Sequence, residues 1–140
     1  MAWRGDRTAE TEAEGGDIAP FVAIDGDPAL GLVLVCDHAS NRIPHGYGCL
    51  GLEADALARH IAYDPGAAAV TRALARRLGA PAVLSTFSRL VIDPNRGEDD
   101  PTLIMRLSDR AVVPGNRDVD DGERARRIAA WYAPYHAAID

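Results

Sequence analysis

Three clusters of polar residues in this sequence have the composition of binding or catalytic sites. The first is DHASNR, residues 37–42, which directly follows an apolar run. A histidine at the end of a rigid strand can offer a ring nitrogen to a metal ion, and an adjacent carboxylate can fix its tautomer. Taken alone, His38 followed by polar residues is a weak signal, because a single histidine there is more often a hydrogen-bonded structural residue.

The second cluster is HIAYDPG, residues 60–66. Asp64 could bind a metal ion at a helix start, or it could cap that helix with Pro65 in the first helical position. The capping interpretation is favoured by residue type, because aspartate is a preferred N-cap residue. The Pro-Gly pair argues against one helix shared by His60 and Asp64, so we interpret His60 as a surface or packing residue.

The third cluster is SRLVIDPNR, residues 88–96, in which two arginines flank an apolar segment. Arginine forms planar two-point contacts with carboxylates, so Arg89 and Arg96 would suit a small anionic substrate. The alternative is an ion pair between Asp93 and either arginine that holds a loop. Residue types alone favour neither interpretation.

Other catalytic signatures are missing from the sequence. It contains no G-x-S-x-G elbow, no phosphate-binding GxxxxGK[ST] loop and no HExxH. The two cysteines, Cys36 and Cys49, do not form a C-x-x-C pair, and Cys36 lies within the apolar run. We interpret His45 and His136 as structural residues.

The elements that would position the clusters follow in the order strand, helix, strand, loop, helix. Residues 31–36 form a continuous apolar run, which predicts a strand buried on both faces, and the polar residues after it indicate a site. Further predicted elements are a docking segment at 18–24, helices at 53–61, 67–78 and 122–139, and strands at 81–85 and around 90–92. Gly79 ends the second helix, Pro134 kinks or ends the third, and residues 94–121 are mostly irregular surface.

This order predicts an α/β fold with a mixed central sheet flanked by helices. Residues 1–17 are polar and charged without periodicity, which predicts a disordered tail, and residues 18–140 would form part of a single domain. Two or three strands make a thin sheet, so we expect the fold to be incomplete at the C-terminus, with an edge that leaves room for self-association.

Composition limits the classes of partner. The 140 residues are 47% hydrophobic and carry a net charge of −6, and arginine supplies all 15 cationic side chains. An acidic chain is poorly suited to wrapping nucleic acid. No apolar stretch approaches the roughly 20 residues of a membrane span, and the N-terminus lacks signal-peptide features. We therefore expect a cytoplasmic protein with no nucleic-acid or membrane partner.

Five segments together resemble the N-formylglutamate amidohydrolase family. They are, in order, CDHASNRIP, HIAYDPGA, FSRLVIDPNR, VVPGN and WYAPYHAAI, and the resemblance extends from about Gly26 to the last residue. Five matching segments in order are far more specific than any one of them. The resemblance implies a zinc hydrolase with a phosphorylase/hydrolase-like fold, related to that of zinc carboxypeptidases and aspartoacylase-like deacylases.

The resemblance also implies roles for individual residues. The resemblance implies that His38 is a zinc ligand and Asp64 the acidic ligand. Against the second role, related carboxypeptidase-like enzymes have an acidic ligand three residues after the first histidine, whereas that position is Asn41 here and cannot supply a carboxylate. The residues that would bind the substrate are Asn41, Arg89, Asn95 and Arg96. Asp37 and Asp93 would hold the metal ligands in position without binding the metal themselves.

Length is the departure from the family pattern, since members are usually nearly twice as long. A second histidine ligand and the carboxylate that serves as general base are expected beyond residue 140. The implied reaction is zinc-dependent hydrolysis of a small anionic N-acyl amino acid, most simply N-formyl-L-glutamate to formate and glutamate, a closing step of histidine degradation. We expect the chain alone to be inactive; the alternatives are a binding module for such a ligand and a truncated remnant.

Overall fold

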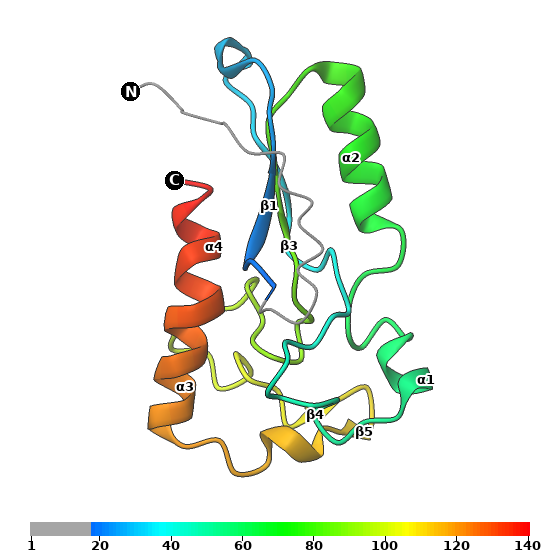
Figure 1. Ribbon diagram of the computed structural model, residues 1–140, viewed down its shortest axis with the longest axis vertical. Coiled ribbons are helices and arrows are strands. Elements are labelled where there is room, and N and C mark those ends of the chain that lie inside the picture. The colour runs from blue at the N-terminus through cyan, green and yellow to red at the C-terminus, as the bar shows by residue number, and fades with distance from the viewer. Residues whose placement is uncertain (1–17) are drawn as a thin grey trace.

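A three-stranded mixed sheet lies at the centre of the computed structural model, which describes residues 18–140 (Figure 1). The strands are β1 (Phe21–Ile24), β2 (Leu34–Cys36) and β3 (Ala82–Ser85), in the order β1-β3-β2. The middle strand, β3, is buried throughout; it pairs antiparallel with β1 and parallel with β2. The mixed α/β sheet that the sequence predicts is confirmed, whereas the predicted tail at 1–17 lies outside the described residues.

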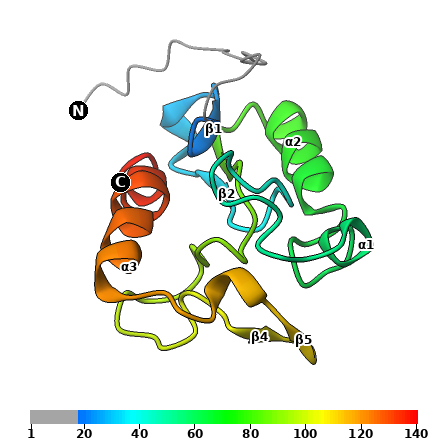
Figure 2. The same ribbon diagram turned by 60° about the horizontal axis from the view of Figure 1, so that its bottom comes forward.

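Helices lie on both sides of this sheet. In Figure 1, α2 (Ala67–Leu78) lies to the right of the strands, and α3 (Asp121–Arg127) and α4 (Ala133–Ala137) form a column to the left. Figure 2 shows that the short helix α1 (Ala54–Leu57) and the hairpin of β4 (Leu107–Ser108) and β5 (Ala111–Val112) lie beyond the end of the sheet. Among residues 18–140, no helix combines the length and apolar character needed to cross a bilayer.

Helix α2 has the predicted bounds, but its N-cap is not the predicted residue. It ends where Gly79 adopts the left-handed conformation, with φ of 65°. Its N-cap is Gly66, at φ of 88°, and no side chain caps it. The interpretation of Asp64 as the cap was therefore wrong: the Pro-Gly turn separates Asp64 from the helix, and its carboxylate faces His38 instead.

The apolar run at 31–36 forms a shorter strand than predicted, and burial on both faces was wrong. Only Leu34–Cys36 pairs with a neighbour, and Leu32, Val33 and Val35 are 44%, 41% and 42% exposed. The reason is the position of β2 at the edge of the sheet, where no strand of the described residues covers its outer side. Leu34 and Cys36, on the face opposite Val35, do pack against small side chains of β3 and α2 such as Ala82 and Ala75.

Two other predicted elements are also corrected. Residues 90–92 are fully buried but form a turn and not a strand, since Val91 N–H bonds to Ser88 within the same loop. The predicted helix at 53–61 is reduced to α1 (Ala54–Leu57) followed by turns. The apolar residues are fully buried in the first place and partly buried in the second. In neither place did their spacing predict the backbone hydrogen bonds.

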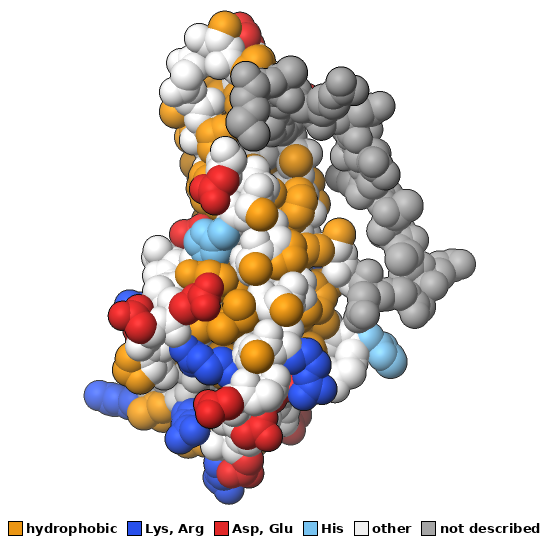
Figure 3. Space-filling model, turned by 90° about the vertical axis from the view of Figure 1, so that its left-hand side faces the viewer, with side chains coloured by type: hydrophobic (Ala, Val, Ile, Leu, Met, Phe, Trp, Pro, Cys, Tyr) orange, Lys and Arg blue, Asp and Glu red, His pale blue; other side chains and the backbone are white. Residues whose placement is uncertain are grey.

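The C-terminal helical column continues past Pro134. Between α3 and α4 the residues Ile128–Tyr132 form a π-helical turn, in which Ala133 N–H bonds to Ile128 O. This wider turn accommodates a proline that has no N–H to donate, so the expected break does not occur. Trp131 and Tyr135 are buried, with ring centroids 5.6 and 6.4 Å from that of Phe87. Figure 3 looks onto this side: hydrophobic side chains run along it, and charged ones gather toward its lower end.

The segment from Pro94 to Asp121 is mostly irregular, as predicted, but it is not confined to the surface. Leu103, Ile104 and Val113 pack in the core. Asn116 holds the segment: its amide donates to Leu90 O at 2.8 Å and Met105 O at 2.7 Å, and its Oδ1 accepts from Arg127 at 2.8 Å. The bonds from the amide give hydrogen-bond partners to two backbone carbonyls that take part in no strand pairing.

The VVPGN segment that contains Asn116 thus has a structural role in this chain. A Cβ on Gly115 would lie 2.8 Å from the backbone of Leu50, so only glycine allows this close approach. Gly115 N–H also donates to Leu50 O at 2.8 Å. The segment joins the loop before α1 to the irregular region beneath the sheet.

Replacing Asn116 by alanine is expected to lower the free energy of unfolding by about 2–4 kcal/mol, because two buried carbonyls and the Arg127 guanidinium lose a partner. Urea denaturation followed by circular dichroism measures this. The same substitution at the exposed Asn95 is the control and should change stability by no more than about 0.5 kcal/mol. Equal effects at both positions would contradict the structural role of Asn116.

Candidate functional site

Three polar side chains from separate segments meet beyond the carboxyl end of β2. His38 lies two residues after the end of β2, Asp64 comes from the loop before α2, and Asp93 follows the buried turn at 90–92. The backbone N–H of Asp64 donates to His38 O at 3.0 Å, which fixes the two loops against each other. The structure thus brings together one residue from each of the three clusters.

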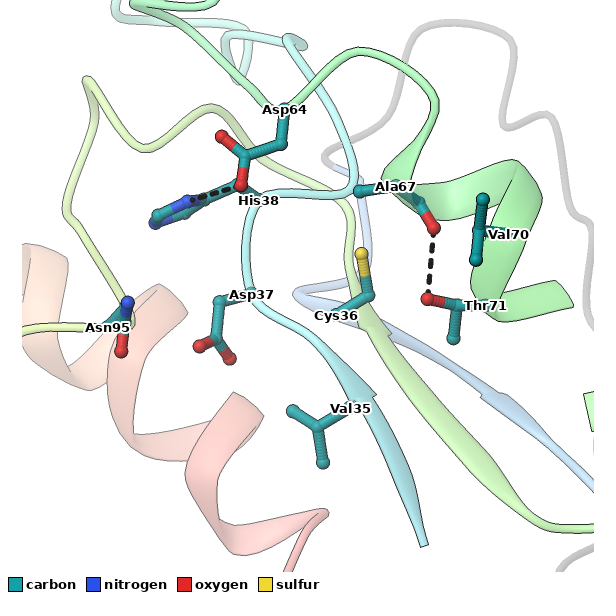
Figure 4. Close-up of a pocket in the computed structure, with 9 residues that line it drawn as sticks. All are labelled: Val35, Cys36, Asp37, His38, Asp64, Ala67, Val70, Thr71 and Asn95. Atoms are coloured by element: carbon teal, nitrogen blue, oxygen red, sulfur yellow. Dashed lines mark hydrogen bonds and ion pairs between the residues drawn. The ribbon is translucent and has the colours of Figure 1, made fainter. Parts of the chain in front are cut away.

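The His38 ring is held between two carboxylates. Its Nε2 lies 2.7 Å from Asp93 Oδ1. Its Nδ1 lies 3.3 Å from Asp64 Oδ2, the contact drawn in Figure 4. His38 is only 6% exposed and Asp93 is fully buried, whereas Asp64 is 54% exposed. A buried carboxylate behind the ring and an accessible one in front of it make the two sides of the imidazole chemically different.

This arrangement fits a cation at Nδ1. The tautomer is assigned from partners: the short contact with Asp93 puts a proton on Nε2, which leaves the Nδ1 lone pair facing an Asp64 oxygen. Two electron-rich atoms 3.3 Å apart repel each other unless a proton or a metal ion lies between them. Tetrahedral nitrogen and oxygen ligands of zinc are also about 3.3–3.4 Å apart, from bond lengths of about 2.0–2.1 Å.

Asp93 cannot join this pair as a ligand to the same ion. It lies on Nε2, on the opposite side of the ring from Asp64. Consistently, the described residues contain no group of three or more His, Cys, Asp or Glu side chains able to hold a metal. His38 and Asp64 therefore offer two donor atoms, and Asp93 can orient the ring from behind.

Asp93 is the most connected side chain of the site. Its Oδ1 also accepts from Asn95 N–H at 2.9 Å, and its Oδ2 accepts from the Arg89 guanidinium at 3.0 Å. Burial would raise the pKa of Asp93, but the bonds from His38 and Asn95 and the nearby positive charges outweigh it and lower that pKa. For His38, burial opposes the imidazolium, yet the contact with Asp93 outweighs burial and raises the pKa.

The two arginines of the third cluster lie beside the same carboxylates. Arg89 is 20% exposed and bonds Asp93, and its other terminal nitrogen lies 3.7 Å from Asp64 Oδ1. Arg96 is 45% exposed, with Nε 3.9 Å from Asp93 Oδ2. The ion-pair alternative therefore describes Arg89 well, while Arg96 keeps most of its guanidinium free for a ligand.

A pocket of about 370 Å³ opens beside the His38–Asp64 pair. Its lining includes Asp37, His38, Asp64 and Asn95 together with apolar and small side chains of β2 and α2 (Figure 4). Asn41 lies elsewhere: its amide donates to Leu57 O at 2.9 Å and holds the end of α1. The structure thus brings Asn95 to the site but gives the Asn41 amide a structural contact.

Asp37 and the C-terminal helix are linked in a way that residue types did not indicate. The Asp37 carboxylate accepts from Tyr135 Oη at 2.6 Å, whereas the described partners of the His38 ring nitrogens are Asp64 and Asp93. Burial and then the Asp37 contact raise the pKa of Tyr135 above its ordinary range, so its hydroxyl remains a donor. The WYAPYH pattern marks a buried helix face, but only the tertiary fold reveals this partner.

Helix α4 and the preceding π-helical turn also fix the loop that carries Asn95 and Arg96. Tyr132 Oη donates to Arg96 O at 2.8 Å, and His136 Nε2 lies 3.0 Å from Pro94 O. The Tyr132 and His136 rings pack against each other with centroids 4.3 Å apart and planes tilted by 47°. The interpretation of His136 as structural agrees with this contact, which is made to a backbone carbonyl and not to His38 or Asp64.

The stability of the metal-free chain is expected to be greatest between about pH 4 and pH 6.5. The lowered pKa of Asp93 stabilises the fold above its ordinary value of 3.8, and this contribution is lost as pH falls through the lowered pKa. The raised pKa of His38 stabilises the fold below 6.5, and that contribution is lost as pH rises through the raised pKa. Urea midpoints measured in chelator at pH 3, 5.5 and 8 test this, and His38→Gln should remove the decline on the alkaline side.

Known proteins match this chain in both sequence and structure. A model of the family described as N-formylglutamate amidohydrolase matches residues 30–140. A gene product of Agrobacterium tumefaciens has a crystal structure with a TM-score of 0.78 and 43% sequence identity, over 85% of this chain and 47% of that one. The crystal structure of N-formylglutamate amidohydrolase from Ralstonia eutropha JMP134 has a TM-score of 0.67 and 29% sequence identity, over 86% of this chain and 49% of that one. This chain therefore spans about half the length of either. No curated protein matches it.

Proposed function

Because this chain belongs to the N-formylglutamate amidohydrolase family, we propose that it supplies part of the zinc and substrate site of a hydrolase acting on N-acyl amino acids. The proposed substrate is N-formyl-L-glutamate, and the products are formate and glutamate. The name of the Ralstonia eutropha protein supports this substrate class. Residues 18–140 would be part of one α/β domain of the zinc carboxypeptidase-like kind.

The observation that carries the proposal is the pair of facing donor atoms on His38 and Asp64. Their separation of 3.3 Å and the buried Asp93 behind the ring support a metal site in which His38 Nδ1 and Asp64 bind the ion. Zinc is proposed because a histidine nitrogen and a carboxylate are among its usual ligands. A zinc ion in such a site activates water and polarises an amide carbonyl.

The remaining residues of the chain have supporting parts in this proposal. Asp93 holds the Nε2 proton of His38, so that Nδ1 stays available as a donor atom. Arg96 and Asn95 would bind a substrate carboxylate, since Arg96 is accessible and Asn95 lines the pocket. A catalytic zinc site needs about three protein ligands, so a further ligand and the general base are proposed to come from the other half of the family fold.

The proposal is tested by assaying formate release from N-formyl-L-glutamate. The chain by itself should bind zinc weakly and show no turnover, whereas a polypeptide of full family length that contains these residues should be active and lose activity in chelator. N-acetyl-L-glutamate and N-formyl-L-alanine define the acyl group and the side-chain carboxylate that are required. Chelator-resistant turnover by the longer polypeptide would contradict a zinc mechanism.

Replacing Arg96 by glutamine in the longer polypeptide is expected to raise KM for N-formyl-L-glutamate about tenfold or more, with a smaller effect on kcat. The reason is loss of a charge-assisted contact with a substrate carboxylate. Arg117→Gln is the matched control and should leave KM unchanged, because Arg117 is exposed like Arg96 but, among the described residues, forms no ion pair with Asp93. An unchanged KM in the Arg96 variant would remove this residue from the substrate site.

A binding module for acylated amino acids is the second candidate function. It is favoured by the finding that the described residues offer no three-ligand metal group, although Arg96 and Asn95 remain accessible. Calorimetry of the chain with N-formyl-L-glutamate distinguishes the two. Saturable binding that chelator does not change supports the module, and zinc-dependent binding supports the partial hydrolase site.

A further inference from the structure

One face of the C-terminal helical column, which carries Tyr132, Tyr135 and His136, is turned toward the candidate site. These residues are three and four positions apart, so they lie on one side of a helix. Each donates a hydrogen bond to a segment that carries a residue of the site. In Figure 4 the pale ribbon of this column runs beside Asp37 and Asn95, which both line the pocket. The column therefore contacts two walls of the same pocket.

Two of these contacts hold the backbone on either side of Asn95. Tyr132 Oη donates to Arg96 O at 2.8 Å, and His136 Nε2 lies 3.0 Å from Pro94 O. A carbonyl oxygen only accepts hydrogen bonds, so we assign a proton to His136 Nε2. Burial, together with the charges of nearby acidic side chains, raises the pKa of Tyr132, so its hydroxyl also stays a donor. Both side chains are therefore donors to this loop.

Asp93 ties the same loop to His38. Its Oδ1 accepts from the Asn95 N–H at 2.9 Å and lies 2.7 Å from His38 Nε2, so one oxygen atom contacts both groups. The Arg96 N–H donates to the backbone carbonyl of Asp93 at 3.2 Å. The loop that carries Arg96 is thus fixed to the proposed metal ligand by Asp93 and to the helical column by two side chains.

The helical column is itself fixed at the end of the sheet where His38 lies. Tyr135 is fully buried, packs against Phe87 with ring centroids 6.4 Å apart, and donates to Asp37, the residue next to His38. Trp131, about one turn earlier, is 5% exposed and packs against the same phenylalanine ring. A donor on a helix that is anchored in this way can define where a loop lies, because its own position is fixed by packing.

We propose that Tyr132 and His136 are positioning residues for a ligand carboxylate. They hold the loop that carries Asn95 and Arg96 in place, so that both polar side chains are presented to the carboxylate before it binds. The inference rests on the proposed function for the role of Arg96. A loop that is ordered in advance loses less conformational entropy on binding, so the two donors increase affinity without touching the ligand. Arg96 is 45% exposed, so its backbone and not its side chain carries this constraint.

The test compares the chain with the double variant Tyr132→Phe/His136→Phe, which keeps two aromatic rings and removes both donors. Backbone hydrogen exchange at Asn95 and Arg96, measured by NMR, should become at least about tenfold faster, because the loop opens more easily. The Asp64 N–H bonds to a different segment and should exchange at an unchanged rate. Unchanged exchange at 95 and 96 would overturn the inference, whatever the chain binds.

The same two substitutions at Tyr47 and His45 are the matched control. His45 is exposed, and neither residue is among the described hydrogen-bond partners of the loop at 94–96. Exchange in that loop should not change in the control variant. Equal acceleration in both double variants would show that the loop responds to general loosening of the fold, and it would contradict a specific role for Tyr132 and His136.

Carboxylate binding is measured on the same chain with glutarate, in a neutral chelator that removes metal ions and carries no carboxylate. Glutarate should shift the NMR signals of Asn95 and Arg96, with Kd raised about five- to tenfold in the Tyr132→Phe/His136→Phe variant and unchanged in the control. Glutaramide, which has no carboxylate, should shift neither signal. Faster exchange with an unchanged Kd would overturn the positioning role, because the bonds would then serve the fold alone. A chain that binds no glutarate would overturn it as well.

Formate release by the longer polypeptide tests the proposed function separately. Glutarate binding that depends on Tyr132 and His136, without turnover of N-formyl-L-glutamate, supports the inference and contradicts the hydrolase. Zinc-dependent turnover with the same KM in the double variant supports the hydrolase and contradicts the inference. The two failures are therefore distinguishable.

Discussion

Replacing His38 by alanine is expected to reduce zinc affinity at least a hundredfold and to abolish turnover in any longer polypeptide that contains this site. The imidazole supplies one of two donor atoms that the described residues offer, and alanine leaves Asp64 alone, half exposed to water. A single carboxylate binds zinc weakly, because the affinity of such sites comes from several ligands that are held in place. Competition with a chromophoric chelator measures the change in affinity.

His60→Ala is the matched control for this prediction. His60 is close to Asp64 in the sequence, but its side chain is 65% exposed. Its Nε2 lies 3.4 Å from Asp109 Oδ2 on the surface. Its removal should leave zinc affinity and turnover unchanged. Equal losses in the two variants would indicate general damage to the fold, and normal zinc binding by the His38 variant would exclude the proposed site.

Replacing Asp93 by alanine is expected to lower the free energy of unfolding by about 3–5 kcal/mol. Asp93 is fully buried and bonds His38, Arg89 and the Asn95 N–H, so its loss leaves a partly buried guanidinium without its closest partner. The Arg89 Nε already lacks a hydrogen-bond partner, which makes the remaining carboxylate contact more important. Zinc affinity should also fall about 10–100-fold, because the His38 ring loses the group that orients it.

Asp109→Ala provides the comparison for Asp93. The Asp109 carboxylate also pairs with an arginine, Arg59, at 3.2 Å, but both side chains are about half exposed. A surface pair of this kind contributes no more than about 1 kcal/mol. Urea denaturation of the two variants in chelator measures the difference, and a loss at Asp93 as small as that at Asp109 would contradict its central place in the network.

The two variants also separate the roles of the residues. His38→Ala should affect zinc affinity more than stability, since Asp93 retains Arg89 and the Asn95 N–H as partners. Asp93→Ala should affect both. If stability and zinc affinity changed in parallel in both variants, the metal site and the fold would depend on one common element, and His38 would have no separate function as a ligand.

The sequence by itself determined the family, the mixed α/β class and the bounds of α2. Five ordered segments gave the family, and a run of helix-forming residues closed by Gly79 gave the helix, because its end depends on a local backbone conformation. The sequence also drew attention to the clusters around His38, Asp64 and Asp93. Such residues can be found from the sequence because polar side chains placed directly beside apolar runs are unusual in a protein core.

Only the tertiary structure decided which of these residues meet. Asp64 is an ordinary N-cap by residue type, yet the Pro-Gly turn directs it to His38, 26 positions away in the chain. Tyr135 reaches Asp37 across 98 positions, and residues 90–92 are buried without forming a strand. The exposure of Val33 and Val35 likewise depends on the place of β2 in the sheet and not on their own apolar character. Contacts between distant segments depend on how strands and loops pack, which local residue patterns do not specify.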